Sequence, residues 1–191
     1  MELSRRFTNI LARAAALVLA VTMIVGCDSD SGGDDGGSNL QPGTFQVEIA
    51  GGSGGSFSGN AVFGTATDPQ SGSYFALILT SNVSAGTTGQ ITYIASRGGL
   101  PATGSYSFGD AESDLDELPQ GTFVALVLDG GAPNWSRTGS LQIESSSSSN
   151  VAGSFQFEAV GIEFSEEGEE EVTKQVSGSF NAVSSTVVIP F

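Results

Sequence analysis

The chain carries two short, nearly continuous apolar runs, Tyr74-Phe-Ala-Leu-Ile-Leu79 and Phe123-Val-Ala-Leu-Val-Leu128. Runs of this length without a helical period are typical of buried β-strands. Other segments alternate instead, as where Phe155, Phe157 and Ala159 are separated by polar residues. Alternation indicates one face in the core and one in water. We therefore expect the two apolar runs to be covered on both faces or to lie at the centre of the core.

Breaks rich in Gly, Ser, Asn and Pro recur at short intervals along the same region. This pattern predicts an all-β fold, an antiparallel β-sandwich of about 8–10 strands, and no helix. A chain of this length can bury a real core as one domain, which we place at residues 44–191. The strands are predicted at 44–50, 55–65, 74–80, 90–95, 104–108, 122–128, 139–144, 151–162, 172–183 and 186–189.

A Gly-Ser-Phe motif recurs within the predicted strands. It occurs at Gly153-Ser-Phe155 and Gly178-Ser-Phe180, each two residues after a valine, and Gly55-Ser-Phe57 repeats its centre. The Gly-Ser pair indicates a bulge or a close approach of two backbones, with the phenylalanine pointing inward. The first two copies are 25 residues apart, which predicts neighbouring antiparallel strands joined by an acidic hairpin end at 163–171.

The first 27 residues resemble the signal peptide of a bacterial lipoprotein. Three arginines precede an apolar run, and this run ends in Ile24-Val25-Gly26-Cys27, which matches the lipobox of that family. The resemblance implies that Cys27 is lipidated and that residues 1–26 are removed. A transmembrane anchor is the alternative, but the run is shorter than the roughly 20 apolar residues that span a bilayer.

Residues 27–43 predict a flexible acidic tether, because they hold four aspartates, many glycines and almost no apolar side chains. The expected partner of the chain is thus a membrane, bound through the lipid. The acidic residues after Cys27 resemble the surface-export signal of lipoproteins in the Bacteroidota, whereas Asp28 alone resembles an inner-membrane retention signal of enterobacteria. We favour the outer membrane or cell surface over the periplasmic face of the inner membrane.

The net charge is −15, and removal of residues 1–26 leaves 20 acidic against three basic side chains, a net charge of about −17. Such a surface repels nucleic acid, which is therefore not expected as a partner. Proteins of halophiles are similarly acidic and poor in lysine, so a saline habitat explains the charge as well as a merely soluble surface does.

The complete absence of histidine argues against most enzyme classes. It excludes Ser-His-Asp and Cys-His nucleophile activation and imidazole metal sites. The glycine clusters lack the lysine of a phosphate-binding loop, so no cofactor is expected. Carboxylate-only hydrolysis of a polysaccharide stays as an alternative function, because it needs only two acids.

Acidic residues at alternate positions of one predicted loop form a weak candidate calcium site. Its members are Asp110, Glu112, Asp114 and Asp116. The EF-hand pattern fails, because Leu115 occupies the position of its glycine and Gly121 that of its final glutamate. A solvated acidic loop is the alternative, and we expect no specific metal site.

Trp135 and Arg137 are the candidate ligand-binding residues, in a predicted loop that starts at Gly130. An indole offers a flat apolar face for a sugar, and the guanidinium beside it can donate hydrogen bonds. A single tryptophan near a strand more often fills the end of a β-sandwich core, which is the competing interpretation.

The C-terminal half resembles small uncharacterised lipoproteins of Bacteroidota-like bacteria, in which a Gly-x-Leu-x-Ile strand precedes two Gly-x-Phe strands of a β-sandwich. The matching residues begin at Gly139, Gly153 and Gly178. That family implies no known activity. The sequence therefore favours a non-catalytic envelope or surface lipoprotein whose domain binds a glycan or a protein partner, the latter by strand addition at a sheet edge.

Overall fold

The computed structural model describes residues 40–51, 54–68, 72–81, 90–111, 113, 117–129, 132–165 and 168–186. These residues belong to one compact unit, Gly37–Val187. Cys27, the rest of the lipobox and the strand predicted at 186–189, except for Thr186, lie outside the described residues. None of the described residues belongs to a helix that is long and apolar enough to cross a membrane.

Nine strands make up almost all of the described chain, which confirms the all-β prediction. They are β1 (Thr44–Ala50), β2 (Gly55–Asp68), β3 (Gly72–Ser81), β4 (Ile91–Arg97), β5 (Gly104–Phe108), β6 (Thr122–Asp129), β7 (Ala132–Ser146), β8 (Asn150–Ser165) and β9 (Gly168–Ser184). The strands predicted at 44–50 and 104–108 match β1 and β5 at both ends, and the other seven within this set are longer than or shifted from their predictions.

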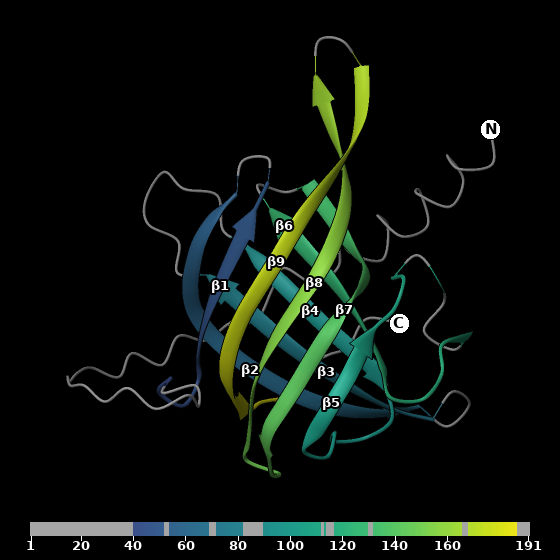
Figure 1. The fold of residues 1–191 in the computed structure, drawn as a ribbon. Helices are drawn as coiled ribbons and strands as arrows, with labels where there is room; N and C mark the ends of the chain where they lie inside the picture. The colour runs from purple at the N-terminus through teal and green to yellow at the C-terminus, as the bar shows by residue number, and fades with distance from the viewer. Residues whose placement is uncertain are drawn as a thin grey trace. The chain divides into compact units, whose positions relative to one another are not determined.

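The strands form one sheet that closes on itself in the order β1-β2-β3-β4-β6-β5-β7-β8-β9. Closure occurs because β1 pairs with β2 on one side and with β9 on the other. In Figure 1, β1, β9, β8, β7 and β5 face the viewer, and β2, β3 and β4 cross behind them. Two strand layers thus enclose one core, as in a sandwich, but the sheet is continuous around that core.

The core fills the inside of the barrel. Alternate residues of every strand point inward, and the largest of them are phenylalanines: Phe45, Phe63, Phe75, Phe108, Phe123, Phe155, Phe157 and Phe180, each at most 4 % exposed. The rings pack against one another, for example Phe108 against Phe157 with centroids 4.8 Å apart. The interior is therefore a packed core, as expected for a domain without a disulfide.

The Gly-Ser-Phe motifs lie on neighbouring antiparallel strands, as predicted. In the β8–β9 register Gly153 faces Phe180, and Phe155 faces Gly178. Gly178 leaves room for the ring of Phe155, whereas Gly153 lets the backbone of Gln142 and Ile143 on β7 come close. The predicted close approach of two backbones occurs at Gly178, where a Cβ would lie 2.5 Å from the carbonyl oxygen of Gln46 on β1 and 2.9 Å from the ring of Phe155.

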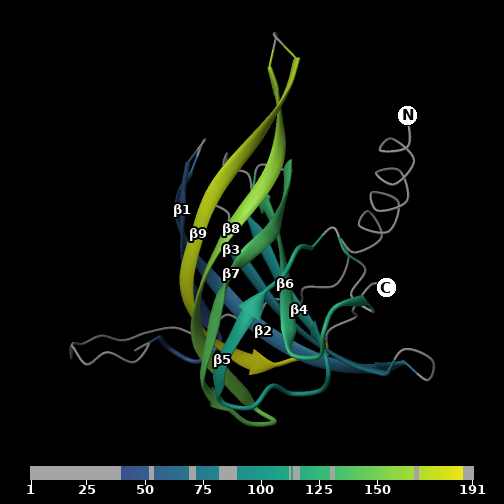
Figure 2. The same ribbon diagram turned by 45° about the vertical axis from the view of Figure 1, so that its right-hand side comes forward.

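The outside of the barrel has two halves of different chemistry. The outward residues of β1, β5, β7, β8 and β9 are mostly polar and exposed, as for Gln46, Glu48, Ser105, Gln142, Gln156 and Ser177. Those of β2, β3, β4 and β6 are mostly apolar and buried or half-buried: Val62, Tyr74, Ala76, Ile78, Tyr93, Ala95, Val124, Leu126 and Leu128. We call the second set the apolar outer face. The sheet is turned in Figure 2 so that β4 and β6 come forward.

Two segments predicted as loops are strands. Residues 132–138 form the start of β7, because they pair with β6 and with β8. The acidic hairpin end predicted at 163–171 is largely paired as well, up to Ser165 opposite Gly168. This ribbon extends beyond the other strands (Figure 1). The register places residue 163 directly opposite Glu170.

Candidate functional site

Trp135 lies on the outer surface of the barrel and does not fill the end of the core. Its neighbours Asn134 and Ser136 point inward and are 2 % and 0 % exposed, whereas Trp135 is half-buried on the opposite side of the strand. It pairs with Leu126 on one side and Val160 on the other. The indole therefore borders the apolar outer face.

An aromatic row crosses this face. Tyr93 of β4 pairs with Leu126 of β6, which pairs with Trp135 of β7. The two aromatic residues are two strand spacings apart, about 10 Å, with the leucine between them. Desolvation by burial raises the pKa of Tyr93 above its usual value. The row is therefore a half-buried apolar surface with aromatic residues at both ends.

Arg137 lies next to this row in an ion pair with Asp110. Its Nη1 is 2.6 Å from the Asp110 carboxylate, and the two side chains are 30 % and 42 % exposed. The pair joins Arg137, which was predicted as a sugar contact, with Asp110, which was predicted as a weak calcium ligand. Both side chains reach solvent, so they can also exchange hydrogen bonds with a ligand.

A buried serine holds this arrangement in place. The Ser136 hydroxyl accepts a hydrogen bond from the Ala125 N–H and donates one to the Gly109 carbonyl, each 2.9 Å long. The Ser136 carbonyl also accepts a bond from the N–H of Ala111, again at 2.9 Å. The segment carrying Asp110 is thereby fixed to β6 and β7, and a β-bulge between Ser136 and Thr138 accommodates Arg137.

The weak calcium candidate finds no support in the described part of the site. Asp110 uses its carboxylate in the ion pair with Arg137, while Glu112, Asp114 and Asp116 lie outside the described residues. Among the residues that are described, no group of three or more acidic, cysteine or histidine side chains could hold a metal ion.

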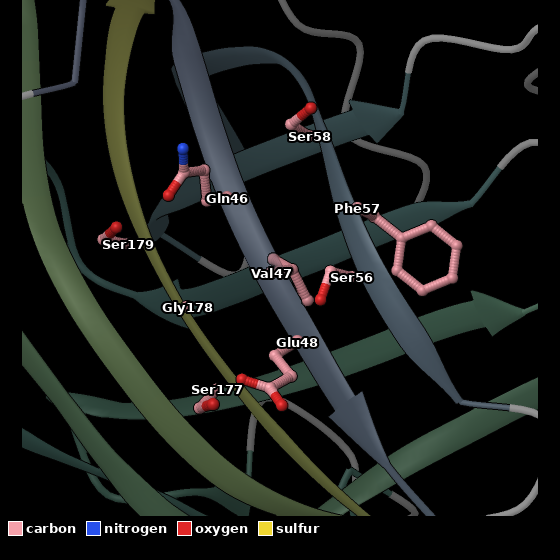
Figure 3. A pocket seen from close by; sticks show the side chains of 9 residues that line it. All are labelled: Gln46, Val47, Glu48, Ser56, Phe57, Ser58, Ser177, Gly178 and Ser179. Carbon is pink, nitrogen blue, oxygen red and sulfur yellow. The ribbon is translucent and has the colours of Figure 1, made fainter.

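A polar groove of about 620 Å³ lies on the other half of the barrel, across β1, β2 and β9 (Figure 3). Its polar lining consists of Gln46, Glu48, Ser56, Ser58, Ser177 and Ser179. Serines on β2 and β9 flank the two longer side chains of β1. Glu48 is the sole carboxylate of this lining, so the groove lacks the pair of acids that glycoside hydrolysis requires.

Sequence reasoning missed a polar set inside one end of the barrel. Its members are Ser81, Gln90, Thr92, Asn134 and Lys174, all at most 9 % exposed. Among the described residues, neither side-chain polar atom of Gln90 has a hydrogen-bond partner, and such an amide costs about 1–3 kcal/mol of stability. Ser81 and Asn134 lie outside the predicted strands, and the sequence pattern gave no reason to expect buried polar side chains at the other positions.

Comparison with protein-family models, with curated proteins and with solved structures finds no match for this chain. The site is therefore argued from its geometry alone. Three residues that the sequence suggested as ligand contacts, Trp135, Arg137 and Asp110, lie on one surface. Tyr93 of β4, which was not predicted as a site residue, lies in the same row as Trp135.

Proposed function

We propose that the protein is a lipid-anchored, non-catalytic binding protein of the bacterial envelope, and that its barrel binds a neutral polysaccharide at the outer surface around Trp135. The observation that carries the ligand class is the outward, half-buried Trp135 in one row with Tyr93, beside the solvent-accessible Arg137–Asp110 ion pair.

The chemistry of the row suits a sugar polymer. Aromatic faces stack on the apolar faces of sugar rings, and the row offers two of them about 10 Å apart, which a chain of several rings can span. The ion pair supplies N–H donors and carboxylate acceptors, and sugar hydroxyls both donate and accept. A flat ligand that is apolar on its faces and polar on its rim thus matches both parts of the surface.

Charge favours a neutral polymer over an acidic one. After removal of residues 1–26 the chain has three basic side chains, Arg97, Arg137 and Lys174. Lys174 is 3 % exposed inside the barrel, and Arg137 is paired with Asp110. A polyanion would therefore meet a surface of strongly negative net charge. The alternative of a carboxylate-dependent polysaccharide-acting enzyme is less favoured, because the polar groove holds one carboxylate.

The lipid anchor at Cys27 explains how such a domain stays at the envelope, since two or more acyl chains hold a protein stably on a membrane. We expect an alkyne-labelled fatty acid fed to producing cells to label the chain, and Cys27→Ser to abolish the label. Protease treatment of intact cells should then remove the barrel, with a lysed-cell control. An unlabelled wild-type chain contradicts the anchor, and a barrel that survives until lysis contradicts the surface location.

Replacing Trp135 with alanine should weaken polysaccharide binding at least ten-fold, because the main stacking face is lost. Electrophoresis in native gels containing a soluble neutral polysaccharide, such as a β-glucan, a xylan or an α-glucan, measures this as reduced retardation. Trp135→Phe keeps an aromatic face and should retain most of the binding.

Gln156→Ala is the matched control, because Gln156 is exposed on the polar half of the barrel. Circular dichroism should show the same β-sheet signal for all variants. Equal retardation of Trp135→Ala and the wild-type protein, or no retardation in any neutral polymer, would count against the proposal.

A further inference from the structure

The polar groove across β1, β2 and β9 is lined by side chains that do not pair with one another. Its six polar lining residues are four serines, Gln46 and Glu48. Within the described part of the chain, no hydrogen bond joins any of these six side chains to another residue. Elsewhere on the polar half neighbouring side chains do pair, as the Ser105 hydroxyl does with the Gln142 amide. The groove therefore keeps its donors and acceptors available for a ligand.

The charge of the groove fits a neutral ligand. Glu48 is the sole carboxylate of its lining and no lining residue is basic, although the chain after residue 26 carries 20 acidic residues. Serine hydroxyls and the Gln46 amide both donate and accept hydrogen bonds, as the hydroxyls of a sugar do. Moving such neutral groups out of water costs much less than moving charged ones. The chemistry of the groove thus matches a neutral, polyhydroxylated molecule.

The groove and the Trp135 row lie on one continuous surface. Figure 1 shows β1, β9, β8 and β7 side by side. The register places Thr173 of β9 level with Trp135 of β7, through Val160 of β8. Ser177 of the groove lies four residues further along β9. Four residues of strand and two strand spacings separate Ser177 from Trp135 by roughly 16 Å, a distance that a chain of several sugar rings can span.

Polar side chains also line the path between the two places. Gln175 and Glu158 lie opposite each other on β9 and β8, and the Gln175 amide donates a 3.3 Å hydrogen bond to the Glu158 carboxylate. Glu158 in turn lies opposite Thr138, the residue after Arg137. A sugar chain that leaves the Trp135 row in this direction therefore meets hydrogen-bonding groups until it reaches the groove.

We propose that the polar groove is a second subsite for the neutral polysaccharide that binds at Trp135. Trp135 stacks on one part of the polymer, and the groove holds another part by hydrogen bonds. This inference rests on the proposed function for the class of ligand, and it adds that the ligand must be long enough to reach both subsites. Because one chain joins the two contacts, affinity should rise steeply with chain length.

Filling the groove tests this inference. Ser177→Leu places a bulkier apolar side chain in the groove. Ser107→Leu is the matched control, because Ser107 is likewise exposed on the polar half but lies on β5, outside the groove. The full chain of each variant is titrated with oligosaccharides of two and of eight rings, prepared from a β-glucan, a xylan and an α-glucan. The emission of Trp135 reports binding.

We expect the octasaccharide of at least one polymer to bind the wild-type protein at least ten-fold more tightly than its disaccharide. Ser177→Leu should remove most of this gain and leave disaccharide binding unchanged, whereas Ser107→Leu should match the wild-type protein for both ligands. Gln46→Ala is a second variant, which removes an exposed amide and should weaken octasaccharide binding about five-fold. It decides the question if Ser177→Leu fails to fold or loses disaccharide binding.

Two failures can be told apart. If both groove variants bind the octasaccharide as tightly as the wild-type protein, or if chain length has no effect, the groove is not a subsite and the inference is overturned, while the site at Trp135 stands. If no oligosaccharide of either length changes the emission of Trp135 in the wild-type protein, the proposed function fails and the second subsite fails with it.

Discussion

Replacing Gly153 with alanine lowers the free energy of unfolding by about 3 kcal/mol. The reason is the close approach of β7 and β8, because a Cβ at this position would overlap the carbonyl oxygen of Gln142 and crowd the Ile143 backbone. Backbone atoms cannot move aside as a flexible side chain can. The barrel must then separate two strands that are paired along most of their length.

Urea unfolding followed by circular dichroism measures this change. Gly99→Ala is the matched control, since Gly99 is exposed and a Cβ there meets no atom within 4 Å. Gly178→Ala should behave like Gly153→Ala, because it would meet Gln46 and Phe155. If Gly153→Ala and Gly99→Ala unfold at the same urea concentration, the close approach of β7 and β8 at Gly153 does not constrain the barrel.

Replacing Ser136 with alanine should cost about 2–4 kcal/mol of stability, since two hydrogen bonds are lost and their partners become unsatisfied. The Ala125 N–H donates to this hydroxyl, and the Gly109 carbonyl accepts from it. Ser136 itself is 0 % exposed, so water cannot replace the hydroxyl without rearrangement. The loss should also loosen the segment that carries Asp110 and thereby weaken ligand binding beside Trp135.

Thermal unfolding and polysaccharide binding are both measured for this variant. Ser140→Ala provides the comparison, because Ser140 lies on the same strand but is exposed, and it should change neither quantity by more than a few tenths of a kcal/mol. A Ser136→Ala protein as stable as the Ser140→Ala protein would contradict the role assigned to the buried hydroxyl.

The strands could be predicted from the sequence because their signals are local. Alternation and glycine-rich breaks fixed β1 and β5 at both ends. The start of β7 was missed because Gly130-Gly-Ala-Pro-Asn134 has the composition of a loop. Its pairing with β6 and β8 overrides that local preference. Closure of the barrel could not be predicted either, because it depends on the pairing of β1 with β9, which is far away in the sequence.

The candidate site was predicted in part for the same reason. A flat indole beside an arginine is visible in the sequence, and so is the acidic loop at Asp110. Their meeting requires a contact across 27 residues and a bulge in β7, neither of which has a local signal. The apolar runs did predict strands covered on both faces, and Tyr74 and Ala76 on the outside of β3 agree with that expectation.

The most direct test of the account is collisional quenching of Trp135, which is the sole tryptophan of the chain. Iodide and the neutral quencher acrylamide are titrated with and without a neutral polysaccharide. We predict that the free protein is quenched by acrylamide and that the polysaccharide protects the indole and shifts its emission to shorter wavelength. An indole already shielded without ligand, or quenching that no neutral polysaccharide changes, would contradict the claim that this surface binds sugar.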